Sequence, residues 1–468
     1  MCGILVGKNL SENQIHSISH RGIEYSIKEN NGITMCHHRL PIQTVEGDSW
    51  SQPIEIGENK YMLFNGEIFN YPSEYDSDTE YLKMLFSRFH FQGGLPMFEA
   101  IFKPHICSWD GFWAIVLVDA EKGDIYAFTD PLGKKVLYKN IEGSVCSEIK
   151  GLLNGEDYLN GTFISGVLKN GYLTTDETPF QNVFKLPNNA FIHWNLNNPL
   201  YITKSAPYYD FNSFNIEFNT YDDKLDWLWD KLESATRARL ISKNYPTSLL
   251  LSGGLDSSII GGLLLKLGAD VQFYSIENGE DEEHIKACEN YWNISSHRLK
   301  YSMDTDDQNN SERLKQIYKK WNESPVDLGS VIPQYYLFDA IKKGSKTRIV
   351  ISGDGEDELF GGYRRINEYD SQLSDIFHEL TYYHLPRLDK LSMAHTLELR
   401  SPFLNLDIVK FAISLPFEER KNKKILKDTF KGLVPDCVID RKKLPLKNSK
   451  IVENPLDYRK KAVSLYLD

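Results

Sequence analysis

The most constraining feature of this 468-residue sequence is a change in its hydrophobic pattern near residue 206. Before that point, short runs rich in β-branched and aromatic residues, such as Trp113–Val118, are separated by Gly, Asn and Asp, which is typical of antiparallel sheet. After it, helical patterns alternate with short apolar runs such as Arg348–Ile351, which predicts a parallel sheet covered by helices. We therefore expect two domains, residues 1–205 and 223–468, joined by a polar and aromatic linker at 206–222.

Composition narrows the class of protein without identifying it. The chain is 41% hydrophobic and 25% charged, with no apolar stretch long enough to span a bilayer and no secretory signal at its start. Its six cysteines form no CxxC pair, which fits reduced thiols better than disulfides or a zinc site. The net charge of −12 argues against non-specific nucleic-acid binding, which needs clustered Lys and Arg. We expect a folded cytoplasmic protein with no membrane or nucleic-acid partner.

The first residues carry a candidate nucleophile. Removal of Met1 would make Cys2 the N-terminal residue. Such a residue combines a thiol that attacks a carbonyl carbon with an α-amine that can act, through a water, as its base. This pairing predicts cleavage of an amide.

A glycine-bearing loop, Ser252–Ser258, follows an apolar strand that we expect to end at Leu251, and it leads into an apolar helix through Lys266. This strand–loop–helix directs backbone N–H groups and a helix dipole at an anion. It lacks the lysine of a GxxxxGK[ST] loop, and it resembles instead the pyrophosphate loop of enzymes that cut ATP between its α and β phosphates. Asp256 would then be a Mg²⁺ ligand. The alternative is an ordinary serine-glycine turn with a capping aspartate.

A second run, Ser352–Tyr363, also follows a strand and concentrates acidic residues beside glycines. The acids are Asp354, Glu356, Asp357 and Glu358. Their mutual repulsion is relieved either by a bound cation or by solvent. Alone the run could be a solvated turn, but beside a pyrophosphate loop it predicts a second magnesium ligand.

Together with Cys2, these two runs resemble the glutamine-hydrolysing asparagine synthetases, and the resemblance covers nearly the whole chain. Further motifs of that family recur in order: His20–Gly22, His38–Ile42, Ser51–Pro53, Phe64–Tyr71, Ser77–Glu80, Asp110–Phe112, Asp130–Lys135, Ser147–Lys150, Leu391–His395, Leu397–Phe403 and Arg441–Lys443. The resemblance implies an αββα N-terminal-nucleophile sandwich followed by an α/β parallel-sheet adenylating domain.

In the first domain the resemblance implies that Cys2 attacks the side-chain amide of glutamine. Asn65, through its side-chain amide, and Gly66, through its backbone N–H, match the oxyanion hole, since neutral donors stabilise a developing negative charge. Taken alone, Asn65-Gly66 is also a hairpin-turn pattern.

The same resemblance implies which residues bind the charged groups of glutamine. Arg39 matches the residue that binds the glutamine α-carboxylate, a task suited to a planar guanidinium. Glu67 and Asp78, with Asn65, complete the predicted glutamine site, and the two acids receive the α-ammonium group. Asp78 alone could instead cap the helix predicted over Asp78–Phe89.

In the second domain the resemblance implies sites for ATP and Mg²⁺. The predicted ATP-binding residues are Leu250, Ser252, Gly253, Gly254, Asp256, Ser257, Ile276, Ser352 and Gly353. Asp256 and Asp357 would bind the metal. Lys443 would neutralise the α-phosphate and the departing pyrophosphate, although the neighbouring Lys442 is an alternative.

The implied activity is an ATP-dependent amidation in which ammonia from glutamine attacks an adenylated carboxylate, most simply that of aspartate. Asp354 would act as base for the attacking ammonia; many family members that make asparagine carry glutamate there. Other departures are Thr129-Asp130 and Tyr209-Asp210, where the family usually has Arg-Asp and Trp-Asp. The alternatives are a different carboxylate acceptor, such as a sugar acid, or a non-catalytic relative. A homodimer is compatible with the family.

Overall fold

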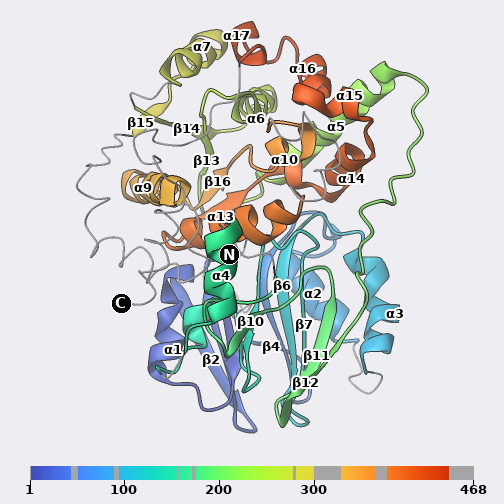
Figure 1. Ribbon diagram of the computed structural model, residues 1–468, viewed down its shortest axis with the longest axis vertical. Helices are drawn as coiled ribbons and strands as arrows, with labels where there is room; N and C mark the ends of the chain where they lie inside the picture. Colours follow the sequence, from blue (N-terminus) through green and yellow to red (C-terminus); the bar gives the residue numbers. More distant parts are fainter. Residues whose placement is uncertain are drawn as a thin grey trace.

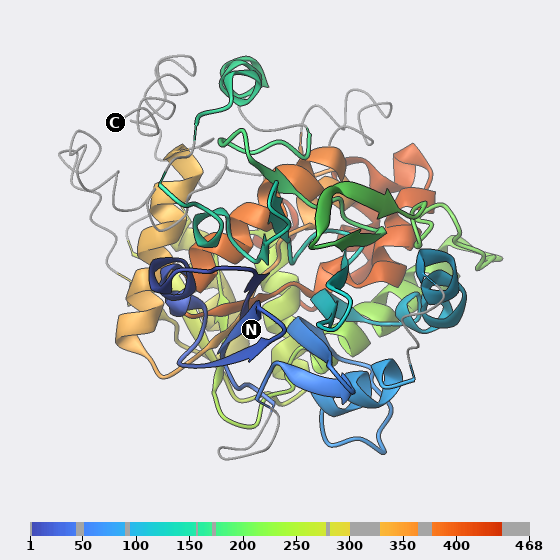
Figure 2. The same cartoon turned by 90° about the horizontal axis from the view of Figure 1, so that it is seen from below.

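The computed structural model of the chain describes residues 2–43, 51–88, 94–155, 158–170, 175–277, 281–299, 328–363 and 377–441. Two regions of different architecture are stacked along the longest axis of the molecule (Figure 1). Figure 2 looks from the side of the first region toward the second. The prediction that antiparallel sheet gives way to alternating strands and helices is confirmed.

The first region contains two antiparallel sheets. In spatial order, the strands of one sheet are β10 (Val183–Lys185), β8 (Tyr138–Asn140), β9 (Val145–Cys146), β1 (Cys2–Gly7), β3 (Ile33–Arg39) and β2 (Glu24–Asn30). The strands of the other are β12 (Asn198–Lys204), β11 (Phe191–Asn195), β7 (Asp124–Thr129), β6 (Gly111–Asp119), β5 (Lys60–Ile68) and β4 (Ile54–Gly57).

Three apolar layers hold these sheets in an αββα sandwich, as predicted. Alternating residues of β1, β3, β5, β6 and β7 form the layer between the sheets. The outer face of the first sheet packs on α1 (Glu12–Ser17), and the outer face of the second packs on α2 (Asp78–Phe86) and α3 (Gly94–Ile106). A further helix, α4, spans Gly161–Asn170. The sequence pattern predicts helix in this half in stretches such as Asp78–Phe89, and the structure has this helix end at Phe86.

The second region is built on one parallel sheet with the order β15 (His297–Leu299), β14 (Val271–Ile276), β13 (Thr247–Leu250), β16 (Ile349–Ile351) and β17 (Glu398–Arg400). One face packs on α9 (Leu328–Gly344) and α13 (Leu385–Met393), and the other packs on α5 (Tyr221–Ala238) and α6 (Leu255–Lys266). The remaining described α-helices of this region are α7 (Glu282–Trp292), α10 (Glu356–Phe360), α14 (Leu406–Ser414), α15 (Phe417–Arg420), α16 (Lys424–Thr429) and α17 (Asp436–Ile439).

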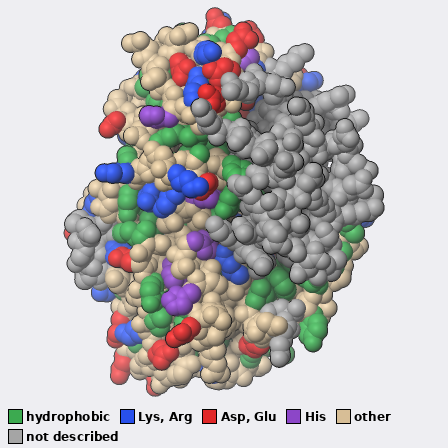
Figure 3. All heavy atoms as spheres, turned by 90° about the vertical axis from the view of Figure 1, so that its left-hand side faces the viewer, with side chains coloured by type: hydrophobic (Ala, Val, Ile, Leu, Met, Phe, Trp, Pro, Cys, Tyr) green, Lys and Arg blue, Asp and Glu red, His purple; other side chains and the backbone are tan. Residues whose placement is uncertain are grey.

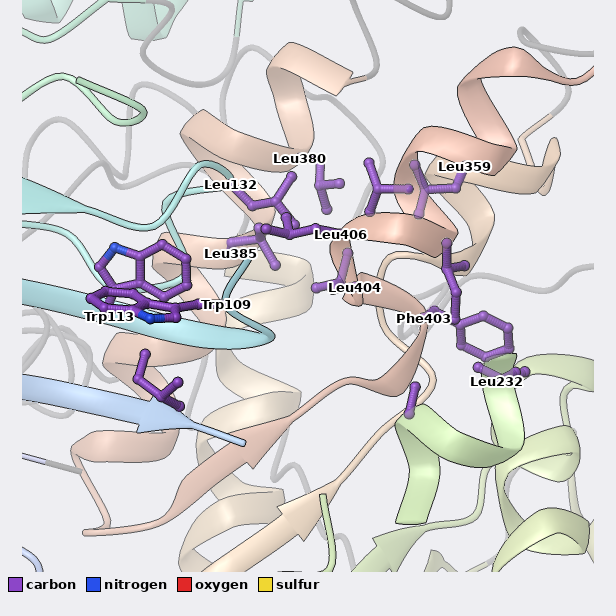
Figure 4. Close-up of a cluster of buried hydrophobic side chains, with 14 of the residues drawn as sticks. Trp109, Trp113, Leu132, Leu232, Leu359, Leu380, Leu385, Phe403, Leu404 and Leu406 are labelled. Carbon is purple, nitrogen blue, oxygen red and sulfur yellow. The ribbon is translucent and has the colours of Figure 1, made fainter. Parts of the chain in front are cut away.

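A continuous apolar cluster crosses from one region into the other (Figure 4). The first region contributes Trp109, Trp113 and Leu132, and the second contributes Leu385 and Leu404, among others. Because burial of apolar area stabilises contacts in proportion to that area, this shared core fixes the two regions against each other.

The segment between β12 and α5 packs on both regions, beginning with Tyr208, whose ring stacks on that of Phe191 in β11 with centroids 4.8 Å apart. Within it Phe214 packs edge-to-face against Phe411, with ring centroids 5.7 Å apart. Thr220 then caps α5 by accepting a hydrogen bond from the backbone N–H of Asp223. The linker bounds of 206–222 stay a prediction, although β12 ends at Lys204 and α5 begins at Tyr221.

Among the described residues, no helix combines the length and apolarity that a membrane crossing requires. Acidic and basic side chains occur side by side on the face shown in Figure 3.

Candidate active sites

The first candidate site lies at the start of the central strand β1. The backbone nitrogen of Cys2 donates a hydrogen bond to Oδ1 of Asn65 at 2.9 Å, and both residues are buried. Nδ2 of Asn65 is also buried and has no hydrogen-bond partner among the described residues. A buried amide donor without a partner is costly unless a ligand supplies one. The side-chain amide is therefore held beside Cys2 with a donor available, as an oxyanion hole requires.

Gly66 lies within β5 and not in a hairpin turn, so the turn interpretation of Asn65-Gly66 is wrong. It pairs with Trp113 of β6. A Cβ added to Gly66 would lie 2.1 Å from the carbonyl oxygen of Phe112 and 2.8 Å from the Cα of Trp113. Glycine is needed here because the two strands approach closely.

Arg39 ends β3, where its backbone lies between Cys2 on β1 and Glu24 on β2. Its Nη1 is 3.1 Å from Oε1 of Glu24, whose carboxylate is about half exposed. The backbone of Arg39 thus lies beside the predicted nucleophile, and its guanidinium contacts a carboxylate that water also reaches. Its role in binding the glutamine carboxylate stays a prediction.

Glu67 and Asp78 are two buried carboxylates in the same neighbourhood. Burial, reinforced by the charge of Glu398, raises the pKa of Glu67 well above its usual range. Burial also raises the pKa of Asp78, to about 6, although Oδ2 of Asp78 accepts a hydrogen bond from the backbone of Ile68 at 3.1 Å. Two such acids are stabilised as carboxylates by a bound cation, such as the ammonium group of an amino acid. The alternative role of Asp78 as a cap is wrong, because Ser77 is the N-cap of α2.

A buried network of ion pairs, which the sequence did not predict, contacts the backbone of Cys2. The Arg21 side chain is fully buried, and its Nε donates to the carbonyl oxygen of Cys2 at 3.0 Å. Its two Nη atoms contact Glu148 at 2.7 Å and Asp389 of α13 at 3.0 Å. Asp389 also pairs with Lys135. Burial alone would raise the pKa of Asp389, but these cations outweigh it and lower the pKa to about 2.

The second candidate site begins where β13 ends at Leu250, one residue earlier than predicted, and the chain turns into α6. Gly253 has a φ of 67°, and a Cβ there would lie 2.9 Å from the backbone nitrogen of Ile285. The hydroxyl oxygens of Ser252 and Ser257 are 2.9 Å apart, and the backbone N–H of Gly254 donates to Ser252 Oγ at 3.3 Å. This closed loop precedes the N-terminus of α6, a favourable place for a phosphate.

The other predicted ATP residues lie at the carboxyl ends of neighbouring strands. Leu250 ends β13, Ile276 ends β14, and Ser352 follows β16. This edge of a parallel sheet is where α/β folds bind ligands. A Cβ on Gly353 would lie 2.8 Å from the carbonyl carbon of Asp256, so the two predicted loops touch. Asp354 follows in the turn before α10 and is half-buried.

Three carboxylates meet beside these loops. Ligand atoms of Asp256, Glu356 and Asp357 all lie within 4.8 Å of one another. Nζ of Lys423 is 2.5 Å from Asp256, 2.5 Å from Glu356 and 2.6 Å from Asp357. Burial and the charge of Asp256 raise the pKa of Glu356, whereas the three acids outweigh burial and raise the pKa of Lys423.

Sequence reasoning missed Lys423 because it is one of several lysines in a polar stretch, Lys421–Lys424. Asn422 and Lys423 both have left-handed backbones, with φ of 53° and 61°, which turns the chain toward the acids. The predicted Lys443 lies outside the described residues, as does Lys442.

Two family profiles cover most of the chain. The profile described as "Glutamine amidotransferase domain" matches residues 1–205, and the profile described as "Asparagine synthase" matches residues 228–381 and 369–460. This chain belongs to the asparagine synthase family. The suspected family is thereby confirmed, and the protein is an amidotransferase enzyme of that family that performs an ATP-dependent amidation.

Curated relatives agree with this assignment to the asparagine synthase family. Asparagine synthetase [glutamine-hydrolyzing] of Cricetulus griseus is 28% identical over 463 residues, covering 91% of this chain and 79% of the relative. The human protein of the same description is 28% identical, with the same coverage of both chains. A probable asparagine synthetase of Acanthamoeba polyphaga mimivirus is 26% identical, covering 92% of this chain and 80% of the relative.

Among solved structures, NMN synthetase from Francisella tularensis matches with 14% identity over 54% of this chain and 88% of its own. Its TM-score of 0.28 is too low to carry an argument.

Proposed function

We propose that this protein is a glutamine-hydrolysing asparagine synthetase. It hydrolyses glutamine at Cys2 and transfers the ammonia to the β-carboxylate of aspartate, which ATP activates as an acyl-AMP. The products are asparagine, glutamate, AMP and pyrophosphate. The observation that supports this most directly is the pairing of Cys2 with a buried Asn65 whose amide donor has no partner among the described residues.

In the first half-reaction, the Cys2 thiol attacks the side-chain amide carbon of glutamine while the α-amine, freed by removal of Met1, accepts its proton through a water. Asn65 and Gly66 donate hydrogen bonds to the developing oxyanion. Arg39 binds the α-carboxylate, and Glu67 and Asp78 bind the α-ammonium group. The tetrahedral intermediate collapses to a thioester as ammonia leaves with the proton that the α-amine had accepted. Water then hydrolyses the thioester and releases glutamate.

In the second half-reaction, the loop Ser252–Ser257 binds the pyrophosphate part of ATP, and Leu250, Ile276 and Gly353 hold the adenosine. Three carboxylates suit a magnesium ion, which prefers oxygen ligands, and Asp256 and Asp357 would hold it. When bound, the metal neutralises phosphate charge. The aspartate carboxylate attacks the α-phosphorus of ATP and displaces pyrophosphate, while Lys443 neutralises the α-phosphate and the departing pyrophosphate. Ammonia then attacks the acyl carbon with Asp354 as base, and AMP leaves.

The identity of the carboxylate that accepts the ammonia is the most specific part of this proposal. Adenylation is needed because a carboxylate at neutral pH is a poor electrophile, but any carboxylate of suitable shape meets that requirement. The same machinery acting on another carboxylate, such as a sugar acid, is therefore the competing function.

The test measures AMP and asparagine formed from Mg-ATP and glutamine, with and without L-aspartate. Cys2→Ala is run beside Cys437→Ala, which removes an exposed thiol as a control. We expect aspartate-dependent AMP and asparagine, lost with glutamine in Cys2→Ala and recovered with an ammonium salt. Glutaminase activity without aspartate-dependent AMP would refute asparagine as the product.

A further inference from the structure

The predicted glutamine site contains a buried side chain that has no role so far, that of Gln43. It is 3% exposed, and its Nε2 donates a hydrogen bond to Oε2 of Glu67. Glu67 and Asn65 are two residues apart on β5, so their side chains project from the same face of the strand. Asn65 accepts a hydrogen bond from the backbone nitrogen of Cys2. Gln43 therefore contacts the site on the same face of β5 as the predicted nucleophile.

The oxygen of the Gln43 carboxamide is the more informative of its two polar atoms. This Oε1 is buried without a hydrogen-bond partner among the described residues. A buried acceptor without a donor costs free energy. An ionised carboxylate only accepts hydrogen bonds, so beside ionised Glu67 the carboxamide presents its nitrogen to Glu67 and its oxygen elsewhere. An acceptor that is buried and unpartnered in a substrate site indicates a donor that the substrate brings.

The α-ammonium group of glutamine would bring such a donor. It carries three N–H donors, as a lysine ammonium group does, and each needs an acceptor when the group is buried. Asp78 lies beside Glu67, because its Oδ2 accepts a hydrogen bond from the backbone of Ile68 at 3.1 Å. Its Oδ1 accepts from the hydroxyl of Thr79 at 3.2 Å. The two carboxylates would thus offer oxygens that already have donors, whereas Oε1 of Gln43 has none among the described residues.

We propose that Gln43 is a further glutamine-binding residue, whose Oε1 accepts a hydrogen bond from the α-ammonium group of the substrate while its Nε2 holds Glu67 for the same group. The site then offers three side-chain acceptors to three donors. A neutral acceptor attracts the ammonium group without adding to the repulsion between the two carboxylates. Gln43 thereby selects substrates that carry an α-amino group. The inference rests on the proposed glutamine hydrolysis and is independent of which carboxylate accepts the ammonia.

The test measures hydrolysis by the full chain of L-glutamine and of glutaramate, which is glutamine without its α-amino group. Gln43→Met keeps the length of the side chain and removes both its donor and its acceptor. It should raise the KM for glutamine about tenfold to a hundredfold, the range for a hydrogen bond to a charged group. The kcat should stay unchanged, because the ammonium group is bound equally in the ground state and the transition state.

The kcat/KM for glutaramate should not change in Gln43→Met, because this compound lacks the group that Gln43 binds. Gln43→Asn keeps the carboxamide but withdraws it by one methylene, and it should show the same dependence on substrate. Gln181→Met is the matched control, since Gln181 is exposed and donates to the carbonyl oxygen of Leu159 at 2.9 Å. Equal losses for both compounds in Gln43→Met and Gln43→Asn would overturn the proposal.

A double variant separates direct contact with the substrate from an effect through Glu67. If Oε1 of Gln43 binds the ammonium group itself, Gln43→Met should lower kcat/KM for glutamine further in a Glu67→Gln chain. If Gln43 only holds Glu67 in place, the second substitution adds no loss, and direct contact is overturned.

Failure of this inference differs from failure of the proposed function. Glutamine hydrolysis that Gln43→Met leaves unchanged would overturn this inference alone. Glutamine hydrolysis that responds as expected, in a protein that forms no asparagine, would overturn the proposed product alone. A chain that hydrolyses no glutamine would overturn the proposed function, and this inference with it.

Discussion

Replacing Asp389 by Asn should destabilise the junction of the two domains. Asp389 is buried on α13 of the second domain and pairs with two cations of the first, Arg21 and Lys135. Arg21 in turn donates to the carbonyl oxygen of Cys2. The substitution keeps the size of the side chain and removes its charge, so buried cations lose an anion that no water can replace.

The size of the effect follows from the pKa of Asp389, which falls from 3.8 to about 2 in the folded protein. At about 1.36 kcal/mol per pKa unit, this difference corresponds to roughly 2 kcal/mol. Because the folded pKa is lowered, this stability is present above pH 3.8 and is lost as pH falls toward 2. The orphaned cations add to the loss, and breaking a buried pair typically costs about 3 to 5 kcal/mol in total.

The assay is urea unfolding at pH 7, followed by tryptophan fluorescence, with Glu55→Gln as the control. Glu55 pairs with Lys28 at the surface, and removing its charge should cost less than about 1 kcal/mol. Asp389→Asn should also reduce glutaminase activity more than ammonia-dependent AMP formation, since Arg21 contacts Cys2. Equal unfolding midpoints for Asp389→Asn and Glu55→Gln would refute this reasoning.

Three further predictions concern the glutamine site. Asn65→Ala should lower the glutaminase kcat by about 10² to 10³ and spare ammonia-dependent AMP formation, because it removes one oxyanion donor; equal losses in both assays would contradict this. Gly66→Ala should destabilise the fold by about 2 to 3 kcal/mol in thermal unfolding, because the new Cβ clashes with the backbone of Phe112. Gly57→Ala is the control and should leave stability unchanged, because its new Cβ would lie 3.5 Å from its nearest neighbour. The KM for glutamine should rise as pH falls through about 6, where Asp78 becomes protonated and loses its attraction for the ammonium group, and Asp78→Asn should abolish that pH dependence.

Local pattern predicted the two domain architectures and the loops at the strand ends well. Strand periodicity is a local property, and the loop Ser252–Ser257 follows β13 within one residue of the predicted strand end. The hydrophobic pattern of the sequence predicted the helices of the first domain less well. It missed α3, which contains Pro104, and α4, which includes two glycines, because both residue types lower helix propensity and tertiary packing overrides that preference.

Ion pairs between residues far apart in the chain could not be predicted from the sequence. Arg21 and Asp389 are 368 residues apart, and Lys423 and Asp256 are 167 residues apart. Nothing in the local sequence distinguishes these side chains from solvated surface charges, since their burial follows from domain docking and from a left-handed turn. Asn65-Gly66 shows the same limit, because a pattern typical of turns occurs in a central strand where two backbones approach closely.

The segment from α13 to β17 has a consequence for protein engineering. This segment belongs to the second domain, but three of its side chains contact the first domain. Asp389 pairs with Arg21 and Lys135, and Lys390 donates to the carbonyl oxygen of Ser147. Arg400 lies 4.0 Å from Glu67. A chimera that joins the amidotransferase half of one relative to the synthase half of another, with its crossover in the linker, would separate these partners. Residues 385–400 should therefore be transplanted together with the first domain, so that the unit of exchange is discontinuous in the gene.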